Sequence, residues 1–197
     1  MKKKKSLLCI SFSARRNGNC ENLLKYTHSL LKDNVDSFEY LNIADYRIEP
    51  CSNCQYECFS EILTLNETVC PKKDDLSKIY NKCNGNDIVL FGIPCYGNHC
   101  PGIYRSFHER ALTQFSSKEE YTVFKRKVNI ILISNLPGGE NALHEVCIDF
   151  LEGHPEVIQF PAREYGMLSL KGDLIESNLV KDRLKGFSNM IIKKYKI

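Results

Sequence analysis

The chain has 197 residues, which is long enough for one compact domain with a full core and short for two. Its apolar content of 43%, charged content of 26% and formal net charge of +3 are typical of a soluble globular protein and give no case for nucleic-acid binding. No stretch is long enough to cross a bilayer, and two arginines directly follow the first apolar run, which argues against a secretory signal. We therefore expect one domain over residues 1–197, a cytoplasmic location and no membrane partner.

Strands and helices are predicted to alternate along the chain. Short apolar runs between turn residues predict strands, and apolar residues three or four positions apart predict helices. The predicted strands cover residues 6–12, 38–43, 87–93, 128–133 and 157–160. The predicted helices cover residues 19–32, a segment that starts at 74 with acids in its first turn, and residues 101–115, 140–152 and 175–194. This alternation implies a parallel sheet that is covered on both faces.

Three loops between these elements are candidate binding loops. In a sheet of this kind, ligands bind beyond the carboxyl ends of the strands, where the strand order reverses. This rule selects residues 11–19, 94–100 and 134–140. The second loop offers a rigid turn, an aromatic face and backbone amides, through Pro94, Cys95, Tyr96, Gly97 and Asn98. The third loop offers a compact polar turn, through Ser134, Asn135, Gly138 and Gly139.

The first loop has the composition of a phosphate cradle. The hydroxyls of Ser11 and Ser13, the guanidinium of Arg15 and the free amides at the start of the next helix can converge on one anion, which the helix dipole also favours. Gly18 allows a tight turn, and Asn19 is expected to cap the helix. A serine-rich turn before a helix can equally be a helix cap alone. The second loop is the feature that favours an anion site.

These loops belong to a series of motifs along the chain. The motifs are Ser11-x-Ser13-x-Arg15-x-x-Gly18-Asn19, Pro94-x-Tyr96, Pro101-Gly102 and Arg105-x-Phe107-x-Glu109-Arg110. Over roughly residues 6–140, their order and spacing resemble those of the FMN-dependent NAD(P)H oxidoreductases of the flavodoxin-like superfamily. Members of that family typically have Lys and Asp where this chain has Arg105 and Glu109, and both departures preserve the charge.

The resemblance implies a flavodoxin-like three-layer α/β/α sandwich around a five-stranded parallel sheet in the order 2-1-3-4-5. It also implies that FMN binds with its phosphate on the first loop and its isoalloxazine ring against the second and third loops. The implied cofactor-binding residues are Ser11, Ser13, Arg15, Gly18, Asn19, Pro94, Cys95, Tyr96, Gly97, Asn98, Ser134, Asn135, Gly138 and Gly139. Relatives are commonly dimers or tetramers, so we expect a homodimer or a homotetramer.

The implied chemistry is hydride transfer from NAD(P)H to the flavin, which then passes electrons to an acceptor. Tyr96 is expected near the flavin ring, and the backbone amides of residues 95–98 are expected to stabilise the anionic edge of the reduced flavin. Hydride transfer needs no side-chain acid or base, so we name no catalytic residue.

A cysteine-rich insertion over residues 50–72 follows the second predicted strand. Its pattern, Cys51-x2-Cys54-x3-Cys58 followed by Cys70, resembles the cysteine motif of iron-sulfur flavoproteins. Four thiolates can hold a 4Fe–4S cluster or a structural zinc ion. The spacing departs from the compact motif between the second and third cysteines and between the third and fourth. A cluster, zinc, and free or oxidised thiols all stay open at this point.

Three functions are compatible with these features. The main interpretation is an FMN-dependent oxidoreductase that takes hydride from NAD(P)H and passes electrons to a small acceptor or a redox protein. The first alternative is an iron-sulfur flavoprotein that carries electrons through a cluster on the four cysteines. The second is a zinc-stabilised flavodoxin-like binding protein without turnover.

Overall fold

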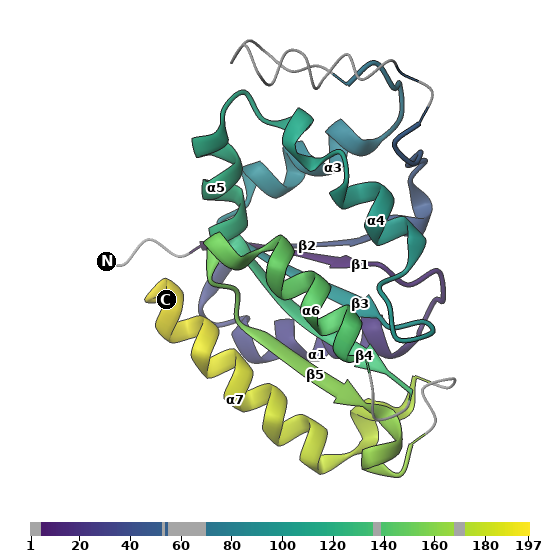
Figure 1. Cartoon of the computed structure of the whole chain (residues 1–197). Helices are drawn as coiled ribbons and strands as arrows, with labels where there is room; N and C mark the ends of the chain where they lie inside the picture. Colours follow the sequence, from purple (N-terminus) through teal and green to yellow (C-terminus); the bar gives the residue numbers. More distant parts are fainter. Residues whose placement is uncertain (1–4, 53, 55–69, 136–138, 168–171) are drawn as a thin grey trace.

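The computed structural model describes residues 5–52, 54, 70–135, 139–167 and 172–197. At its centre is a five-stranded parallel sheet in the order β2-β1-β3-β4-β5 (Figure 1). The strands are β1 (Lys5–Ser11), β2 (Val35–Asn42), β3 (Ile88–Pro94), β4 (Val128–Ser134) and β5 (Val157–Pro161). The predicted flavodoxin-like sandwich and its strand order are confirmed. The cysteine-rich insertion lies mostly outside the described residues.

Helices cover both faces of this sheet (Figure 1). One face packs against α1 (Asn19–Leu31) and α7 (Asn178–Tyr195). The other packs against α3 (Leu76–Gly85), α4 (Gly102–His108), α5 (Lys118–Lys127) and α6 (Glu140–Asp149). Successive side chains of β1 alternate between the two cores, with Leu7 on the α1 side and Leu8 on the other, as the two-residue period of a strand requires. Among the described helices, none has the length and apolar character of a membrane span.

Short 3-10 helices connect several of these elements. They are η1 (Ile43–Asp45), η2 (Ala111–Gln114), η3 (Leu151–Gly153), η4 (Ala162–Tyr165) and η5 (Asp173–Glu176). The helix predicted over residues 101–115 therefore ends at His108 and is followed by η2. The last predicted helix begins at Asn178 because residues before it form η5 and Ser177 caps the helix, accepting a hydrogen bond from Val180 N at 3.5 Å.

One helix was not predicted, and one prediction about a helix start was wrong. Helix α5 was not predicted, because its outer face is strongly charged and masks the apolar period. Ser117 begins it by accepting a hydrogen bond from Glu120 N at 3.2 Å, and the Ser-x-x-Glu pattern could have revealed this start. Helix α3 has no acid in its first turn; instead, Asp74 precedes it and accepts from Leu76 N at 3.2 Å.

A mostly buried histidine ends α4 and faces side chains of α5 and α6. His108 Nδ1 is 3.4 Å from Asp149 Oδ2, and its Nε2 is 3.3 Å from the Tyr121 hydroxyl. Burial lowers the pKa of His108; the charges of Lys125 and Arg105 lower it further, and that of Asp149 opposes them. The folded protein therefore disfavours the protonated imidazole more than the unfolded chain does.

This burial predicts that stability falls in weak acid. In the unfolded chain a histidine titrates near pH 6.5, so the unfolded state binds more protons than the folded state once the pH drops below about 6.5. The free energy of unfolding should therefore decrease between about pH 7 and 5. Urea unfolding of the wild type and of His108→Gln across this range measures the effect. Equal pH slopes for the two proteins would contradict the prediction.

Candidate functional site

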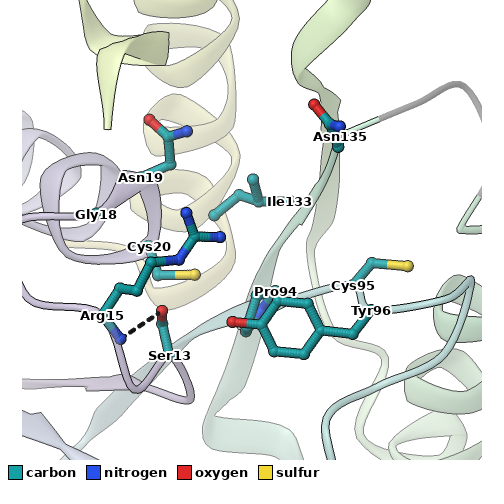
Figure 2. Close-up of a pocket in the computed structure, with 10 residues that line it drawn as sticks. All are labelled: Ser13, Arg15, Gly18, Asn19, Cys20, Pro94, Cys95, Tyr96, Ile133 and Asn135. Carbon is teal, nitrogen blue, oxygen red and sulfur yellow. Dashed lines mark hydrogen bonds between the residues drawn. The ribbon is translucent and has the colours of Figure 1, made fainter. Parts of the chain in front are cut away.

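A cavity of about 300 Å³ lies at the carboxyl ends of β1, β3 and β4 (Figure 2). The sheet order reverses between β1 and β3, which is where parallel sheets of this type bind ligands. The cavity is lined by Ser13, Arg15, Gly18, Asn19, Cys20, Pro94, Cys95, Tyr96, Ile133 and Asn135. The structure thus brings together residues from all three predicted loops. Cys20 and Ile133 were not predicted as binding residues, although Cys20 directly follows the first predicted loop and Ile133 ends the predicted strand before the third loop.

The first loop is held by its own serine hydroxyls. Ser11 is fully buried outside the cavity lining and accepts a hydrogen bond from Ser13 N at 3.3 Å. Ser13 accepts from Arg15 N at 3.2 Å, as Figure 2 shows. A hydroxyl that accepts from an amide still has its own proton to donate. Ser13 can therefore donate to an anion in the cavity, whereas Ser11 supports the loop.

The start of α1 differs from the prediction. Gly18 caps the helix, and Asn19 is its first residue rather than its cap. The Asn19 side chain instead accepts a hydrogen bond from Leu174 N at 3.0 Å, which anchors η5 on α1. Some amides of the loop are already used: Asn17 N, for example, donates to the Glu21 carboxylate at 2.8 Å. The N-terminus of α1 carries the positive end of the helix dipole, and Gly18, Asn19 and Cys20 place it at the cavity.

A glycine in the sheet allows α1 to approach closely. A Cβ on Gly92 of β3 would lie 2.9 Å from Leu24 Cδ1 and 3.3 Å from the Cys20 carbonyl oxygen. The loop that precedes α1 also joins β3, because Phe12 N donates to Gly92 O at 2.9 Å. Gly92 therefore determines where the helix and its N-terminus lie relative to the sheet.

The second loop contains a tight two-residue turn. Tyr96 N donates to His99 O at 2.9 Å, and His99 N donates to Tyr96 O at 3.1 Å. The two central residues, Gly97 and Asn98, have φ values of +56° and +71°, as a type I′ turn requires. The Tyr96 ring is 46% exposed and points from this turn toward the first loop (Figure 2). The turn thus places an aromatic face at the cavity.

The expected use of the amides of residues 95–98 is wrong for two of them. Cys95 N donates to Ile133 O at 2.7 Å, and Tyr96 N is used in the turn. The Asn98 amide interacts with the Cys95 thiol, where it opposes the rise in thiol pKa that burial causes. Neither Gly97 nor Asn98 lines the cavity. Both residues shape the turn that carries Tyr96.

The third loop lies opposite, after β4. Asn135 lines the cavity, and its buried Oδ1 has no hydrogen-bond partner among the described residues. Ser134 is buried outside the lining, and Gly139 caps α6 with a φ of +90°. Gly139 N donates to Asn98 Oδ1, so the second and third loops are joined. Gly138 lies outside the described residues.

The last motif of the resemblance supports the fold around the cavity. Arg105 Nη2 pairs with Glu145 at 2.7 Å. The Glu109 carboxylate accepts from Cys51 N, and Arg110 forms a buried ion pair with Asp74. These charged residues therefore tie α4 and the residues that follow it to α6, to the chain after β2 and to Asp74, two residues before α3.

The predicted metal site receives no support from the described residues. Cys51, Cys54 and Cys70 are free thiols, and Cys58 lies outside the described part of the chain. Cys70 Sγ accepts a hydrogen bond from Arg110 Nη1 at 3.5 Å. Burial raises the pKa of the Cys51 thiol, with help from the Glu109 charge. Within the described ranges, no three His, Cys, Asp or Glu side chains are grouped so that they could hold a metal ion.

The fold is that of a flavodoxin-like α/β protein, and its cavity lies at the switch point of the sheet. Residues 6–162 match the model of the family described as NADPH-dependent FMN reductase, and the chain belongs to this family. The protein is therefore an NAD(P)H-dependent flavin oxidoreductase, with FMN and a nicotinamide nucleotide as its cofactor and substrate.

Solved structures share this fold. An NAD(P)H:quinone oxidoreductase from Methanothermobacter marburgensis has a TM-score of 0.66 at 12% identity, with 96% of this chain and 96% of that chain covered. An FMN-dependent NADH-azoreductase from Bacillus anthracis in complex with FMN has a TM-score of 0.64 at 10% identity, with 94% of this chain and 99% of that chain covered. A flavone reductase has a TM-score of 0.67 at 14% identity, with 97% of this chain and 63% of the flavone reductase chain covered. No curated protein matches the chain significantly.

The close approach at Gly92 predicts that Gly92→Ala damages the site and the fold together. The added methyl group overlaps Leu24 and pushes α1 from β3, so we expect a loss of about 1–3 kcal/mol in the free energy of unfolding. The matched control is Gly186→Ala in α7, where a Cβ meets no atom within 4 Å and alanine favours the helix. Denaturant unfolding measures both. A Gly92→Ala variant as stable as the wild type would contradict this account.

Proposed function

We propose that FMN binds in this cavity with its phosphate on the first loop. The observation that carries the proposal is the convergence of three anion-binding groups at the switch point: the Ser13 hydroxyl, the Arg15 guanidinium and the N-terminus of α1. Ser11 and Asn19 would hold these groups in place through the buried hydrogen bonds that they make. The family of the chain supports the choice of FMN as the phosphate-bearing ligand.

The opposite side of the cavity fits a flavin ring. The polar edge of an isoalloxazine carries an N–H between two carbonyl oxygens, and the unpartnered Asn135 Oδ1 is an acceptor that such an N–H would satisfy. Pro94, Cys95 and Ile133 offer apolar surface, and Tyr96 offers an aromatic face. Gly97, Asn98, Ser134 and Gly139 would act by shaping and joining the two loops, and Gly138 would belong to the same loop.

When it is bound, FMN supplies the acceptor for a hydride from NAD(P)H and the donor to the next electron acceptor. The chain binds and orients it: Ser13 and Arg15 hold the phosphate, and Asn135 holds the polar edge of the ring. Tyr96 lines the cavity, where its aromatic face would contact the ring. Among the described residues that line the cavity, Arg15 alone carries a charged side chain, which suits a reaction that needs no acid or base from the protein.

We further propose that the chain acts as one domain, in the cytoplasm, as a homodimer or homotetramer, and that its acceptor is a small oxidised molecule or a redox protein. The name of the quinone oxidoreductase neighbour supports a small acceptor, because its fold is shared over nearly the full length of both chains. The exposed Tyr96 face is the surface on which a flat acceptor or the nicotinamide would approach.

The phosphate site predicts a selective effect of Arg15→Ala. Loss of one charged hydrogen bond should weaken FMN binding about 10- to 100-fold and leave the binding of riboflavin, which lacks the phosphate, unchanged. Quenching of flavin fluorescence by the protein measures both affinities.

The neighbouring arginine is the matched control for this experiment. Arg16 pairs with Asp45 and does not line the cavity, so Arg16→Ala should bind FMN like the wild type. Equal losses for FMN and riboflavin in Arg15→Ala would place the phosphate elsewhere. No binding of FMN by the wild type would overturn the proposed site.

The family of the chain predicts a flavin enzyme whose NAD(P)H oxidation does not require a cluster on the four cysteines. Protein purified without oxygen should show flavin absorbance without the broad absorbance of a cluster, and Cys70→Ser should keep the NAD(P)H oxidation rate. About four irons per chain, together with loss of electron delivery in Cys70→Ser, would instead establish the electron carrier with a cluster. One zinc per chain without flavin would establish the binding protein without turnover.

A further inference from the structure

One carboxylate on α6 receives three donors from the segment that follows β3. Glu145 Oε1 is 2.9 Å from His99 Nδ1, and Glu145 Oε2 accepts from Cys100 N at 3.3 Å and from Arg105 Nη2 at 2.7 Å. The Glu145 side chain is only 14% exposed. The partners come from the end of the Tyr96–His99 turn, from the residue after it and from α4.

The charge of this carboxylate is strongly favoured. Burial raises its pKa, but the hydrogen bonds from His99, Arg105 and Cys100 outweigh burial and lower the pKa of Glu145 to about 2. Glu145 is therefore ionised throughout the physiological range. A buried carboxylate with three donors holds its partners more tightly than a neutral acceptor would.

The same turn is joined to α6 a second time. Asn98 Oδ1 accepts from Gly139 N at the start of α6, and Asn98 O accepts from Ala142 N at 3.0 Å. These bonds and the Glu145 bonds connect successive residues of the turn to successive turns of one helix. Tyr96, the other end of the turn, has no such bond among those described to α6 and depends on the turn for its position.

We propose that Glu145 is a positioning residue that holds the Tyr96–His99 turn on α6 and thereby fixes the Tyr96 ring beside the flavin. Glu145 does not line the cavity, so it acts through the turn and not by touching the cofactor. The effect on flavin binding rests on the proposed FMN site. The effect on the turn itself does not.

The first experiment tests the turn in the protein without FMN. Hydrogen–deuterium exchange of residues 95–100 should become about tenfold faster in Glu145→Gln, because the variant loses charged hydrogen bonds. Exchange in β3 should stay as in the wild type. The control is Glu152→Ala, which removes an ion pair with Lys125 away from the turn. Unchanged exchange of residues 95–100 in Glu145→Gln would overturn the proposal.

The second experiment is a double-mutant cycle on FMN affinity. Glu145→Gln should raise the dissociation constant about tenfold in the wild-type background and less than about twofold in the Tyr96→Ala background, because the effect passes through the ring. A merely structural role would give the same fold-change in both backgrounds and would overturn the positioning role. Failure of the wild type to bind FMN would overturn the proposed function, and the exchange experiment would still decide the role of Glu145 in the turn.

Discussion

The whole site depends on how closely α1 can approach the sheet. Gly92 has no side chain in the place where Leu24 and the Cys20 carbonyl pack against β3, so the N-terminus of α1 lies directly over the end of the strand. The dipole and the first-turn amides of α1 are useful to an anion only at this edge, because both effects fade within one turn of the helix. Packing in the core thus determines the electrostatics of the cavity.

The other side of the cavity depends on hydrogen bonds between loops. The Tyr96–His99 turn is joined to α6 through Asn98 and Glu145, and the loop before α6 contributes Asn135 to the cavity. The cavity therefore lies between two hydrogen-bonded units: the first loop with α1, and the turn with α6.

The charged motif that contains Arg105 and Arg110 follows the second loop closely in the sequence, but both arginines form ion pairs within the scaffold. Arg105 lies close to the binding loops in the sequence, yet its guanidinium pairs with Glu145 on α6. Arg110 is almost fully buried and pairs with Asp74 just before α3. The buried guanidinium of Arg110 needs a partner of opposite charge, and the partly exposed Arg105 joins α4 to α6, so both residues support the scaffold.

The amino-acid sequence alone determined the alternation of strands and helices, and with it the parallel sheet and the edge at which ligands bind, because apolar periodicity and turn residues are local properties. It also predicted the residues of the three loops. Most of them, such as Ser13, Arg15 and Tyr96, meet in one cavity. The resemblance to a known family predicted FMN as the cofactor, and the family to which the chain belongs supports this prediction.

Only the tertiary structure decided which of these residues face the cavity and which hold the loops. Asn19 is of a residue type that often caps helices, but its side chain accepts a hydrogen bond from Leu174 N, which is far away along the chain. Ser11 has the same hydroxyl as Ser13, but it is the last residue of β1 and does not line the cavity. Glu145 has no local pattern that marks it, because its three partners come from another loop and another helix. Long-range hydrogen bonds of this kind depend on how the elements pack, and the residues on either side of them in the chain do not encode that packing.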